Sequence, residues 1–372
     1  MRILQASRFK LKLRQVIGIT LAWMFIGALD ALNTYSISDS EYMRSVAGFD
    51  FARYFWVNTL SAAFVGFFSG SVLVFYLRER FRNKPFGFTL LVNTLLISAI
   101  NYIIILLAFS IFLNLKFDAW LLKIDMLTGF ASTIRSAYYL KILIFWWIVV
   151  LGTLIGLHVN EKYGPGILFN LLMGRYHHPR EEERIFMFVD IKSSTTIAER
   201  LGHIRFFDLL NDFFRDITNS IIYTSGEVYQ YVGDEIVLSW KMEHGIHNAN
   251  CIRCFYSMQE AIQKKSAKYL DAYGVLPEFK AGLHCGLVTS GEIGVIKKDI
   301  VFSGDVMNTT SRIQNLCNSY GVKILLSKYL LDRLNLPPHD YKPERVGMIE
   351  LKGKKQKVEL YTFDESILEG RG

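Results

Sequence analysis

Four long apolar segments lie within the first 160 residues of this chain, and they constrain its fold more than any other feature. The segments cover about residues 15–35, 55–77, 87–113 and 142–159. Each is close to the roughly 20 residues with which an α-helix crosses the hydrocarbon core of a bilayer. One such segment alone is also typical of a buried core helix. Four of them, with only 7 Asp and Glu residues over residues 1–160, favour a multi-pass α-helical membrane domain of about four helices.

Positive charge is concentrated in the same half of the chain. Residues 1–160 carry 15 Lys and Arg and 7 Asp and Glu, whereas residues 161–372 carry 27 of each, so the net charge of +8 arises in the first half. The neutral second half argues against nucleic acid as a partner.

The basic residues also predict an orientation. Nine of them precede the first apolar segment or follow the second: Arg2, Arg8, Lys10, Lys12, Arg14, Arg78, Arg80, Arg82 and Lys84. With four spans, all nine lie on one side of the bilayer. Because Lys and Arg accumulate in cytoplasmic loops, we expect a protein of the cell inner or plasma membrane with both termini and the second half in the cytoplasm.

Two regions leave the organisation of the chain open. Within residues 114–141, short apolar pieces are compatible with the outer membrane interface, so the number of spans there is not settled. Residues 161–184 include the chain-breaking Gly164-Pro165-Gly166. They also carry an apolar stripe at helical spacing, formed by Ile167, Leu168, Leu171 and Leu172. A solvated linker and a coupling helix that pairs with its copy in a dimer both fit this segment.

The rest of the chain alternates between β and α patterns. The predicted elements are strands at 185–190, 279–288, within 291–303, at 322–326 and after 344, a hairpin at 227–240, and helices at 194–201, 203–223, 247–272 and 305–317. This order predicts an α+β sandwich with one sheet and helices on one face. The predicted division is a membrane domain over residues 1–160, a linker or coupling helix over 161–184, an α+β domain over 185–363 and a tail over 364–372.

Two carboxylates stand at the ends of apolar β-type runs in this α+β domain. Asp190 ends the run that begins at Ile185, and Asp234 follows Gly233 in the turn of the hairpin. Carboxylates at such positions are natural Mg²⁺ ligands, and two that converge can hold two ions over the phosphates of a nucleotide. Asn308 and Arg312, one helical turn apart, can reach the same phosphates from a helix. The set indicates phosphoryl chemistry on a nucleoside triphosphate.

Five motifs occur in order across residues 185–363. They are Phe188-Val189-Asp190-Ile191 with the following Ser193-Ser194-Thr195, Gly233-Asp234, Gly282-Leu-His-Cys-Gly286, Gly304-Asp305-Val-Met-Asn308-x-x-x-Arg312, and Leu351-Lys352-Gly353-Lys354. Together they resemble the class III nucleotidyl cyclases of the membrane-bound bacterial type. The resemblance implies a class III cyclase domain with a ferredoxin-like βαββαβ core after the membrane domain.

The resemblance also implies roles for the residues of the first two motifs. Asp190 and Asp234, with the backbone carbonyl of Ile191, are implied to hold two Mg²⁺ or Mn²⁺ ions. Backbone amides of the Ser193, Ser194 and Thr195 segment are implied to cradle the β- and γ-phosphates.

Later motifs are implied to complete the site. Asn308 orients the ribose, and Arg312 stabilises the charge that develops on the α-phosphate. Lys352 binds the terminal phosphates, with Lys354 as the nearby alternative. In this family the metal carboxylates come from one subunit and the Asn/Arg pair from the other, so the resemblance implies a homodimer with two shared sites.

The positions that read the base depart from the family pattern. Adenylate cyclases commonly carry Lys four residues before the second metal carboxylate, where this chain has Gln230, and Asp or Thr seven residues before the ribose Asn, where it has Val301. The Glu that guanylate cyclases usually carry at the first position is also absent. We therefore favour an adenylate cyclase that converts ATP to 3′,5′-cyclic AMP and pyrophosphate for intracellular signal transduction, with GTP or mixed specificity as the alternative.

Other functions remain compatible with parts of the pattern. Val232-Gly-Asp-Glu-Ile236 is superficially similar to the Gly-Gly-Asp-Glu-Phe turn of diguanylate cyclases. A membrane receptor that binds nucleotide without turnover is a second alternative. Cys251-x-x-Cys254, with His247 upstream, fits a metal or redox site, but this stretch reads as one helix and lacks the spacing of a zinc knuckle.

Overall fold

The computed structural model of the chain describes residues 2–37, 51–81, 84–117, 137–163, 178–296, 298–334, 336, 341–350 and 357–363. The chain divides into two compact units. One is Phe9–Leu168, and the other contains Phe169–Gly372 together with Met1–Arg8.

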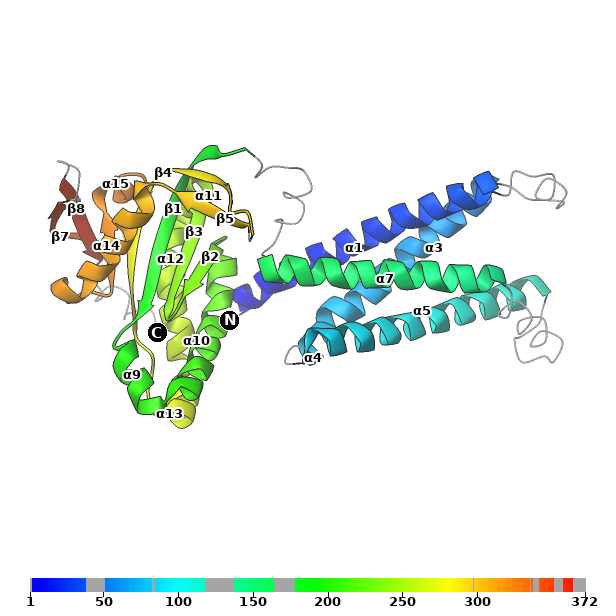
Figure 1. Ribbon diagram of the computed structural model, residues 1–372, viewed down its shortest axis with the longest axis horizontal. Coiled ribbons are helices and arrows are strands. Elements are labelled where there is room, and N and C mark those ends of the chain that lie inside the picture. Colours follow the sequence, from blue (N-terminus) through cyan, green and yellow to red (C-terminus); the bar gives the residue numbers. More distant parts are fainter. Residues whose placement is uncertain are drawn as a thin grey trace. The chain divides into compact units, whose positions relative to one another are not determined.

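The first unit is built from long apolar helices (Figure 1). They are α1 (Arg2–Ile37), α3 (Phe51–Val72), α5 (Phe86–Phe117) and α7 (Ala137–Tyr163). After α3 the chain continues through a π-helical segment, Leu73–Leu77, and a short helix α4, Arg78–Arg80. Among the described residues, four helices are long and apolar enough to cross a membrane. The prediction of four apolar helices ahead of the α+β domain is confirmed; most of residues 114–141 lies outside the described residues.

Helix α1 approaches α3 closely inside this bundle. A Cβ atom built on Gly66 would lie 2.8 Å from the Cβ of Trp23, so only glycine fits there without a shift. Trp23 is buried with Val16, Val74 and Ile97 in the apolar interior of the unit. The indole of Trp23 donates a hydrogen bond to Thr153 of α7 at 2.9 Å, which connects the first helix to the last.

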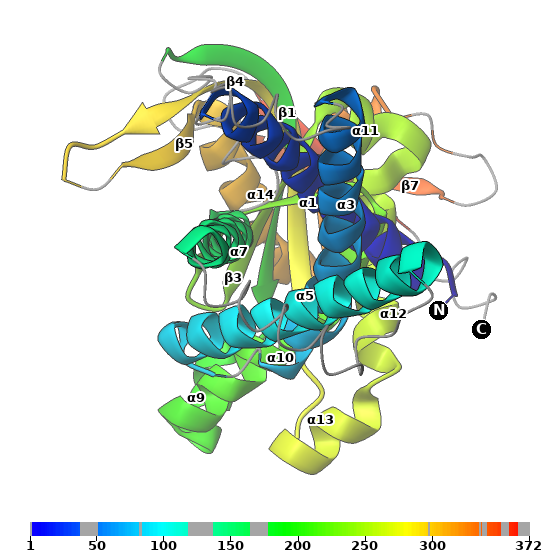
Figure 2. The ribbon, with the colours of Figure 1, turned by 90° about the vertical axis from the view of Figure 1, so that its right-hand side faces the viewer.

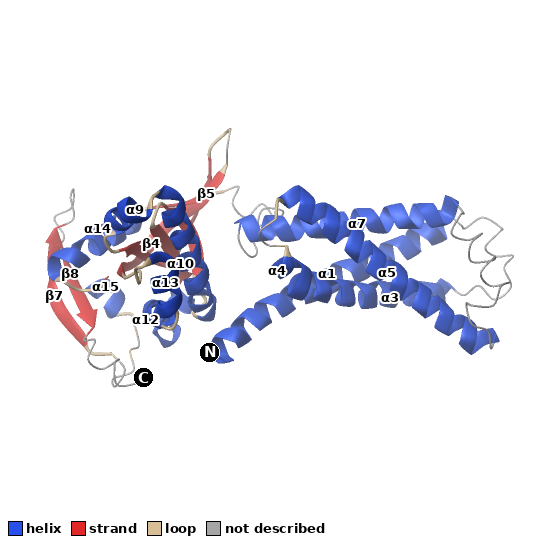
Figure 3. Cartoon of the chain, turned by 90° about the horizontal axis from the view of Figure 1, so that it is seen from below, coloured by secondary structure: helices blue, strands red, loops and turns tan. Residues whose placement is uncertain are grey.

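One mixed sheet dominates the second unit (Figure 3). Its strands are β1 (Arg180–Ile191), β2 (Glu227–Val232), β3 (Glu235–Lys241), β4 (Phe279–Ile293), β5 (Asp299–Ser303), β6 (Ile324–Ser327), β7 (Pro343–Glu350) and β8 (Lys357–Phe363). Their order is β2-β3-β1-β4-β6-β8-β7, and β5 pairs with β4. Only β4 and β6 are parallel neighbours among the pairs described. The first four strands give the antiparallel βαββαβ core that the resemblance predicted. Strands β4 and β5 form a hairpin that projects from the sheet (Figure 2).

Helices cover both faces of this sheet, so the prediction of helices on one face is wrong. The helices of this unit are α9 (Ser194–Leu201), α10 (His203–Tyr223), α11 (Met242–Ile246), α12 (Asn250–Gln263), α13 (Ser266–Tyr273), α14 (Asp305–Tyr320) and α15 (Lys328–Leu331). Ile185 and Met187 of β1 pack toward α10 and α12, whereas Phe186 and Phe188 pack with Val306 of α14 on the other face. The apolar run of β1 is continuous, and this is the pattern of a strand buried on both faces.

The predicted single helix over 247–272 is also wrong. Asn248 and Ala249 have positive φ values of 49° and 50°, α12 begins only at Asn250, and the chain bends again between α12 and α13. Cys251 and Cys254 are buried on α12, and burial raises the pKa of both thiols, that of Cys254 to about 12. They are therefore protonated apolar core residues in this fold.

Candidate active site

Sheet register brings three charged residues together at one end of β1. Asp190, the penultimate residue of β1, lies opposite Glu235 of β3 and opposite Lys280 of β4. Asp234 precedes Glu235 in the β2–β3 turn, where Gly233 has a φ of +64°. Residues far apart in the sequence therefore meet because β1 is a central strand with a neighbour on each side.

Asp190 has one partner from the helix α14 and one from the neighbouring strand β4. Gln314 of α14 donates a hydrogen bond from Nε2 to its Oδ2 at 3.1 Å, and Lys280 Nζ lies 3.3 Å from the same oxygen. Burial raises the pKa of Asp190, and so do a hydrogen bond and charge repulsion from Asp234, while Lys280 opposes the rise. The carboxylates of Asp190 and Asp234 thus lie close enough to interact directly.

Glu235 adds a third carboxylate to this end of the sheet. Burial and the charges of Asp190 and Asp234 raise the pKa of Glu235 to about 7. Lys280, with a side chain only 8% exposed, is the cation that partly offsets this negative charge. Sequence analysis assigned no role to Glu235, Lys280 or Gln314. Glu235 directly follows Asp234, and Lys280 is the second residue of the predicted strand 279–288. The sequence does not give the pairing register that places both of them opposite Asp190.

The carboxylate donor set fits a hard divalent cation. Crowded carboxylates repel one another, and a bound cation relieves that repulsion. Within the described parts of the chain, no group of three or more His, Cys, Asp or Glu side chains is arranged to hold a metal ion. The fit therefore rests on the pair of Asp190 and Asp234, which is the pair that the resemblance implied.

Helix α9 begins at Ser194, shortly after Asp190 and the end of β1. Lys192 donates a backbone hydrogen bond to Glu278 at 2.8 Å, and Ser193 then adopts a left-handed φ of 55°. This turn starts the helix at Ser194, with Ser193 and Thr195 exposed. Free backbone amides in the first turn of a helix favour anions such as phosphate.

Helix α14 has one face buried against the sheet and another face open to solvent. Gln314 is buried and faces Asp190, whereas Asn308 is exposed and Arg312 is half-exposed. Gly282 of β4 permits the close contact, since a Cβ there would lie 2.3 Å from the backbone nitrogen of Gln314. Neither Asn308 nor Arg312 is among the described contacts of Asp190. One chain therefore gathers the two carboxylates but leaves the Asn/Arg pair on a separate, open face.

The two positions predicted to read the base lie on different strands, β2 and β5, and the residues next to them are in contact. Gln230 is exposed on β2, next to a bulge, and Val301 is half-buried on β5. The adjacent rings of Tyr229 and Phe302 have centroids 5.0 Å apart, and the Phe302 N–H donates to the Tyr229 hydroxyl at 3.3 Å. Lys352 and Lys354 lie outside the described residues.

Comparisons with known proteins agree with this fold. The family model described as the adenylate and guanylate cyclase catalytic domain matches residues 177–365 of this chain. Adenylate cyclase 2 of Rhizobium meliloti (strain 1021) is 36% identical over 216 residues, or 58% of this chain and 59% of that protein. An adenylate cyclase of Anabaena cylindrica is 28% identical over 181 residues, or 47% of this chain and 35% of that protein. The solved structure of a bacterial light-regulated adenylyl cyclase has a TM-score of 0.52 at 21% identity, covering 62% of this chain and 66% of that one.

The βαββαβ sheet with acidic residues at the end of β1 and in the β2–β3 turn defines a nucleotidyl cyclase fold. Since the family model matches half of the sequence, the chain belongs to the class III adenylate and guanylate cyclase family. The predicted family is confirmed, and the diguanylate cyclase alternative is set aside. The chain spans about three fifths of the length of the Rhizobium relative.

Proposed function

We propose that this protein is a membrane-bound adenylate cyclase that converts ATP to 3′,5′-cyclic AMP and pyrophosphate. The observation that carries the proposal is the meeting of Asp190 and Asp234 at one end of the sheet, beside the N-terminus of α9, in a chain of the cyclase family. Residues 1–160 are the proposed membrane domain, 161–184 the coupling segment, 185–363 the catalytic domain and 364–372 a tail. The catalytic domain and both termini face the cytoplasm, where ATP is available.

In the proposed reaction, Asp190, Asp234 and the carbonyl of Ile191 hold two Mg²⁺ or Mn²⁺ ions. A bound divalent ion supplies Lewis acidity, which makes the ribose 3′-hydroxyl a better nucleophile. The backbone amides that follow Ser193 bind the β- and γ-phosphates, aided by Lys352 or Lys354. These groups orient the triphosphate so that the 3′-oxygen faces the α-phosphorus.

A second copy of the chain supplies the remaining groups in this proposal. Asn308 orients the ribose and Arg312 stabilises the negative charge on the α-phosphate. Their exposure on α14, away from the contacts of Asp190, supports a site shared across a twofold axis. Exposed apolar side chains at the tip of the β4–β5 hairpin, Val295 and Ile296, are also consistent with contact to another chain.

ATP is the favoured substrate because the chain lacks the Glu that reads guanine at position 230. Gln230 can donate and accept hydrogen bonds, and Val301 offers no side-chain hydrogen bond. GTP is therefore expected as a side substrate, and a mixed-specificity or guanylate cyclase is the alternative.

The direct test is the full-length protein in lipid vesicles with ATP or GTP and Mg²⁺, followed by quantification of cyclic nucleotide and pyrophosphate. Asp234→Ala should abolish both products without loss of folded protein. Asp271→Ala removes an exposed carboxylate on α13 and serves as the matched control, with activity retained. Full activity of Asp234→Ala contradicts the carboxylate assignment, and nucleotide binding without pyrophosphate release favours the inactive receptor.

A further inference from the structure

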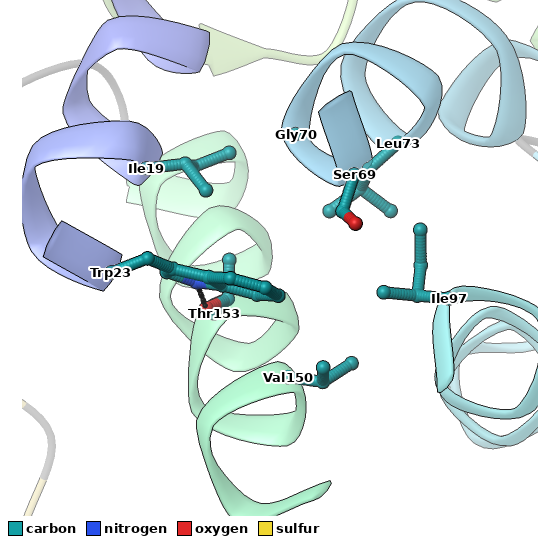
Figure 4. Close-up of a pocket in the computed structure, with 8 residues that line it drawn as sticks. All are labelled: Ile19, Trp23, Ser69, Gly70, Leu73, Ile97, Val150 and Thr153. Carbon is teal, nitrogen blue, oxygen red and sulfur yellow. Dashed lines mark hydrogen bonds between the residues drawn. The ribbon is translucent and has the colours of Figure 1, made fainter. Parts of the chain in front are cut away.

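A cavity of about 480 Å³ lies within the helical unit, between α3, α5 and α7. This volume is within the range of about 300–1,000 Å³ that is typical of small-molecule sites. A second cavity nearby, between Trp23, Ser69, Ile97 and Val150, measures only about 10 Å³ and is no larger than one water molecule requires (Figure 4). Only the larger cavity can therefore hold a ligand.

Apolar and aromatic side chains form most of the cavity wall. Trp146 and Trp147 of α7 and Val65 of α3 are examples, and no charged side chain is found among the described residues that line the cavity. An ion in this position would be costly, since the surrounding helices are apolar and no opposite charge is present. The wall therefore selects an uncharged molecule, and the indole rings of Trp146 and Trp147 favour an aromatic one.

A small number of polar groups in the cavity wall can orient a bound molecule through hydrogen bonds. Buried Asn101 accepts a hydrogen bond from Ser69 Oγ to Oδ1 at 2.5 Å, which leaves its Nδ2 amide as a donor. The Asn58 amide, by contrast, already donates to the Gly27 carbonyl at 2.9 Å. The hydroxyl of Tyr102 also lines the cavity and has no hydrogen bond to any described residue. Unused donors in an apolar unit favour a ligand that carries an acceptor.

The rim of the cavity is accessible from the side of the bundle. Among the lining residues of α7, Ile144 and Trp147 are 52% and 50% exposed. In a membrane, such a side opening faces the acyl chains, so a ligand reaches it by dissolving in the bilayer first. Among the described helices, α7 is also the last one before strand β1 in the sequence, so an occupant would contact the described helix nearest in sequence to the catalytic domain.

We propose that this cavity is a binding site for an aromatic, uncharged, lipid-soluble molecule with a carbonyl-type acceptor. The apolar body lies against Trp146 and Trp147, and the acceptor takes the hydrogen bond from Asn101. This proposal is based on the geometry of the helical unit and does not depend on the proposed cyclase activity.

Benzophenone has this chemistry and is a photoreactive probe. The full-length protein in phosphatidylcholine vesicles is irradiated over a range of benzophenone concentrations, and labelled residues are located by mass spectrometry. We expect saturable labelling of peptides from α3, α5 and α7 that line the cavity. Non-saturable labelling spread evenly over the lipid-facing helices would overturn the proposal.

Three variants sharpen the test. Ser98→Trp fills the cavity and should abolish the saturable component, and Asn101→Leu should raise the half-saturating concentration about tenfold, as expected for one lost hydrogen bond. Leu91→Trp places the same new side chain at a position on α5 that is 61% exposed and outside the cavity, and should label like the unmodified chain. Unchanged saturable labelling in a folded Ser98→Trp variant, with native helicity by circular dichroism, would equally overturn the proposal.

Discussion

At the residue scale, Gln314 connects α14 to the proposed metal-binding carboxylate. Its amide donates to the same Asp190 oxygen that Lys280 approaches from β4, so a neutral donor and a cation restrain one carboxylate from two sides. Gln314 is buried and is therefore a positioning residue in the proposed reaction, since it acts through Asp190. Groups that orient metal ligands typically change metal affinity or activity by about 10- to 100-fold when they are replaced.

We expect Gln314→Glu to lower cyclase activity by about 10- to 100-fold and to raise the Mg²⁺ concentration required for half-maximal activity. The physical reason is that a fourth carboxylate, added to those of Asp190, Asp234 and Glu235, replaces a hydrogen-bond donor beside Asp190. Activity is measured against Mg²⁺ concentration at saturating ATP. Asn318→Glu introduces the same charge at an exposed position one turn later on α14 and should behave like the unmodified chain. An unchanged Mg²⁺ dependence in Gln314→Glu would show that this hydrogen bond does not position Asp190.

At the scale of elements, the distance between α14 and β4 depends on Gly282. A Cβ at this position would lie 2.3 Å from the nitrogen and 2.6 Å from the Cα of Gln314, both backbone atoms that cannot rotate away. The substitution must therefore move the whole helix, including Asn308 and Arg312. The glycine thus sets the position of one proposed half-site relative to the sheet.

Gly282→Ala should destabilise the protein by about 1–3 kcal/mol and lower activity on the order of 100-fold. Thermal unfolding and cyclic AMP formation are measured in parallel. Gly286→Ala is the matched control on the same strand, since its Cβ would meet only a methyl group of Val306, at 2.8 Å, and that side chain can adjust. Equal effects of the two variants would mean that backbone contact with α14 is not the cause.

Helix α13 docks on α10 through a buried carboxylate. Asp216 of α10, 2% exposed, accepts hydrogen bonds from Lys265 at 2.5 Å and from Tyr269 at 3.0 Å. Burial raises its pKa, but these hydrogen bonds and the charges of Lys265 and Lys268 outweigh burial and hold the pKa below the ordinary value of 3.8. A carboxyl with a lower pKa in the folded state stabilises the fold above its unfolded pKa, and this contribution is lost as the pH falls through the folded value.

Asp216→Asn should therefore lower the free energy of unfolding by about 1–3 kcal/mol at pH 7, with the difference shrinking below pH 3.8 as the native carboxylate becomes protonated. Denaturant unfolding at several pH values tests this. Asp271→Asn, at an exposed position on α13, should have little effect at any pH. A pH-independent loss in Asp216→Asn would point to altered packing instead of a lost charge.

At the scale of the whole molecule, the proposed reaction divides each active site between two chains, with the carboxylates from one chain and Asn308 and Arg312 from the other. Mixing Asp190→Ala chains with Arg312→Ala chains, each inactive alone, should restore activity to about a quarter of the unmodified level. Half of the dimers in an equal mixture are heterodimers, and each of these has one intact site of two. Differently tagged chains allow heterodimers to be isolated and assayed for cyclic AMP. Isolated heterodimers without activity would exclude the shared site.

The sequence alone determined the features that depend on local pattern. Four apolar runs of membrane length predicted four helices, and the motifs around Asp190, Asp234 and Asn308 predicted the cyclase family. Such signals are readable because hydrophobic periodicity and turn residues report on their own neighbourhood.

Tertiary structure alone decided what surrounds those motifs. Only the register of β1 between β3 and β4 brings Glu235 and Lys280 to Asp190, and only the packing of α14 on the second face brings Gln314 there. A strand that is apolar on both sides can be covered in several ways, and which element covers it depends on contacts between residues far apart in the chain. The same reason explains the break after α12, where Lys265 leaves the helix and pairs with Asp216.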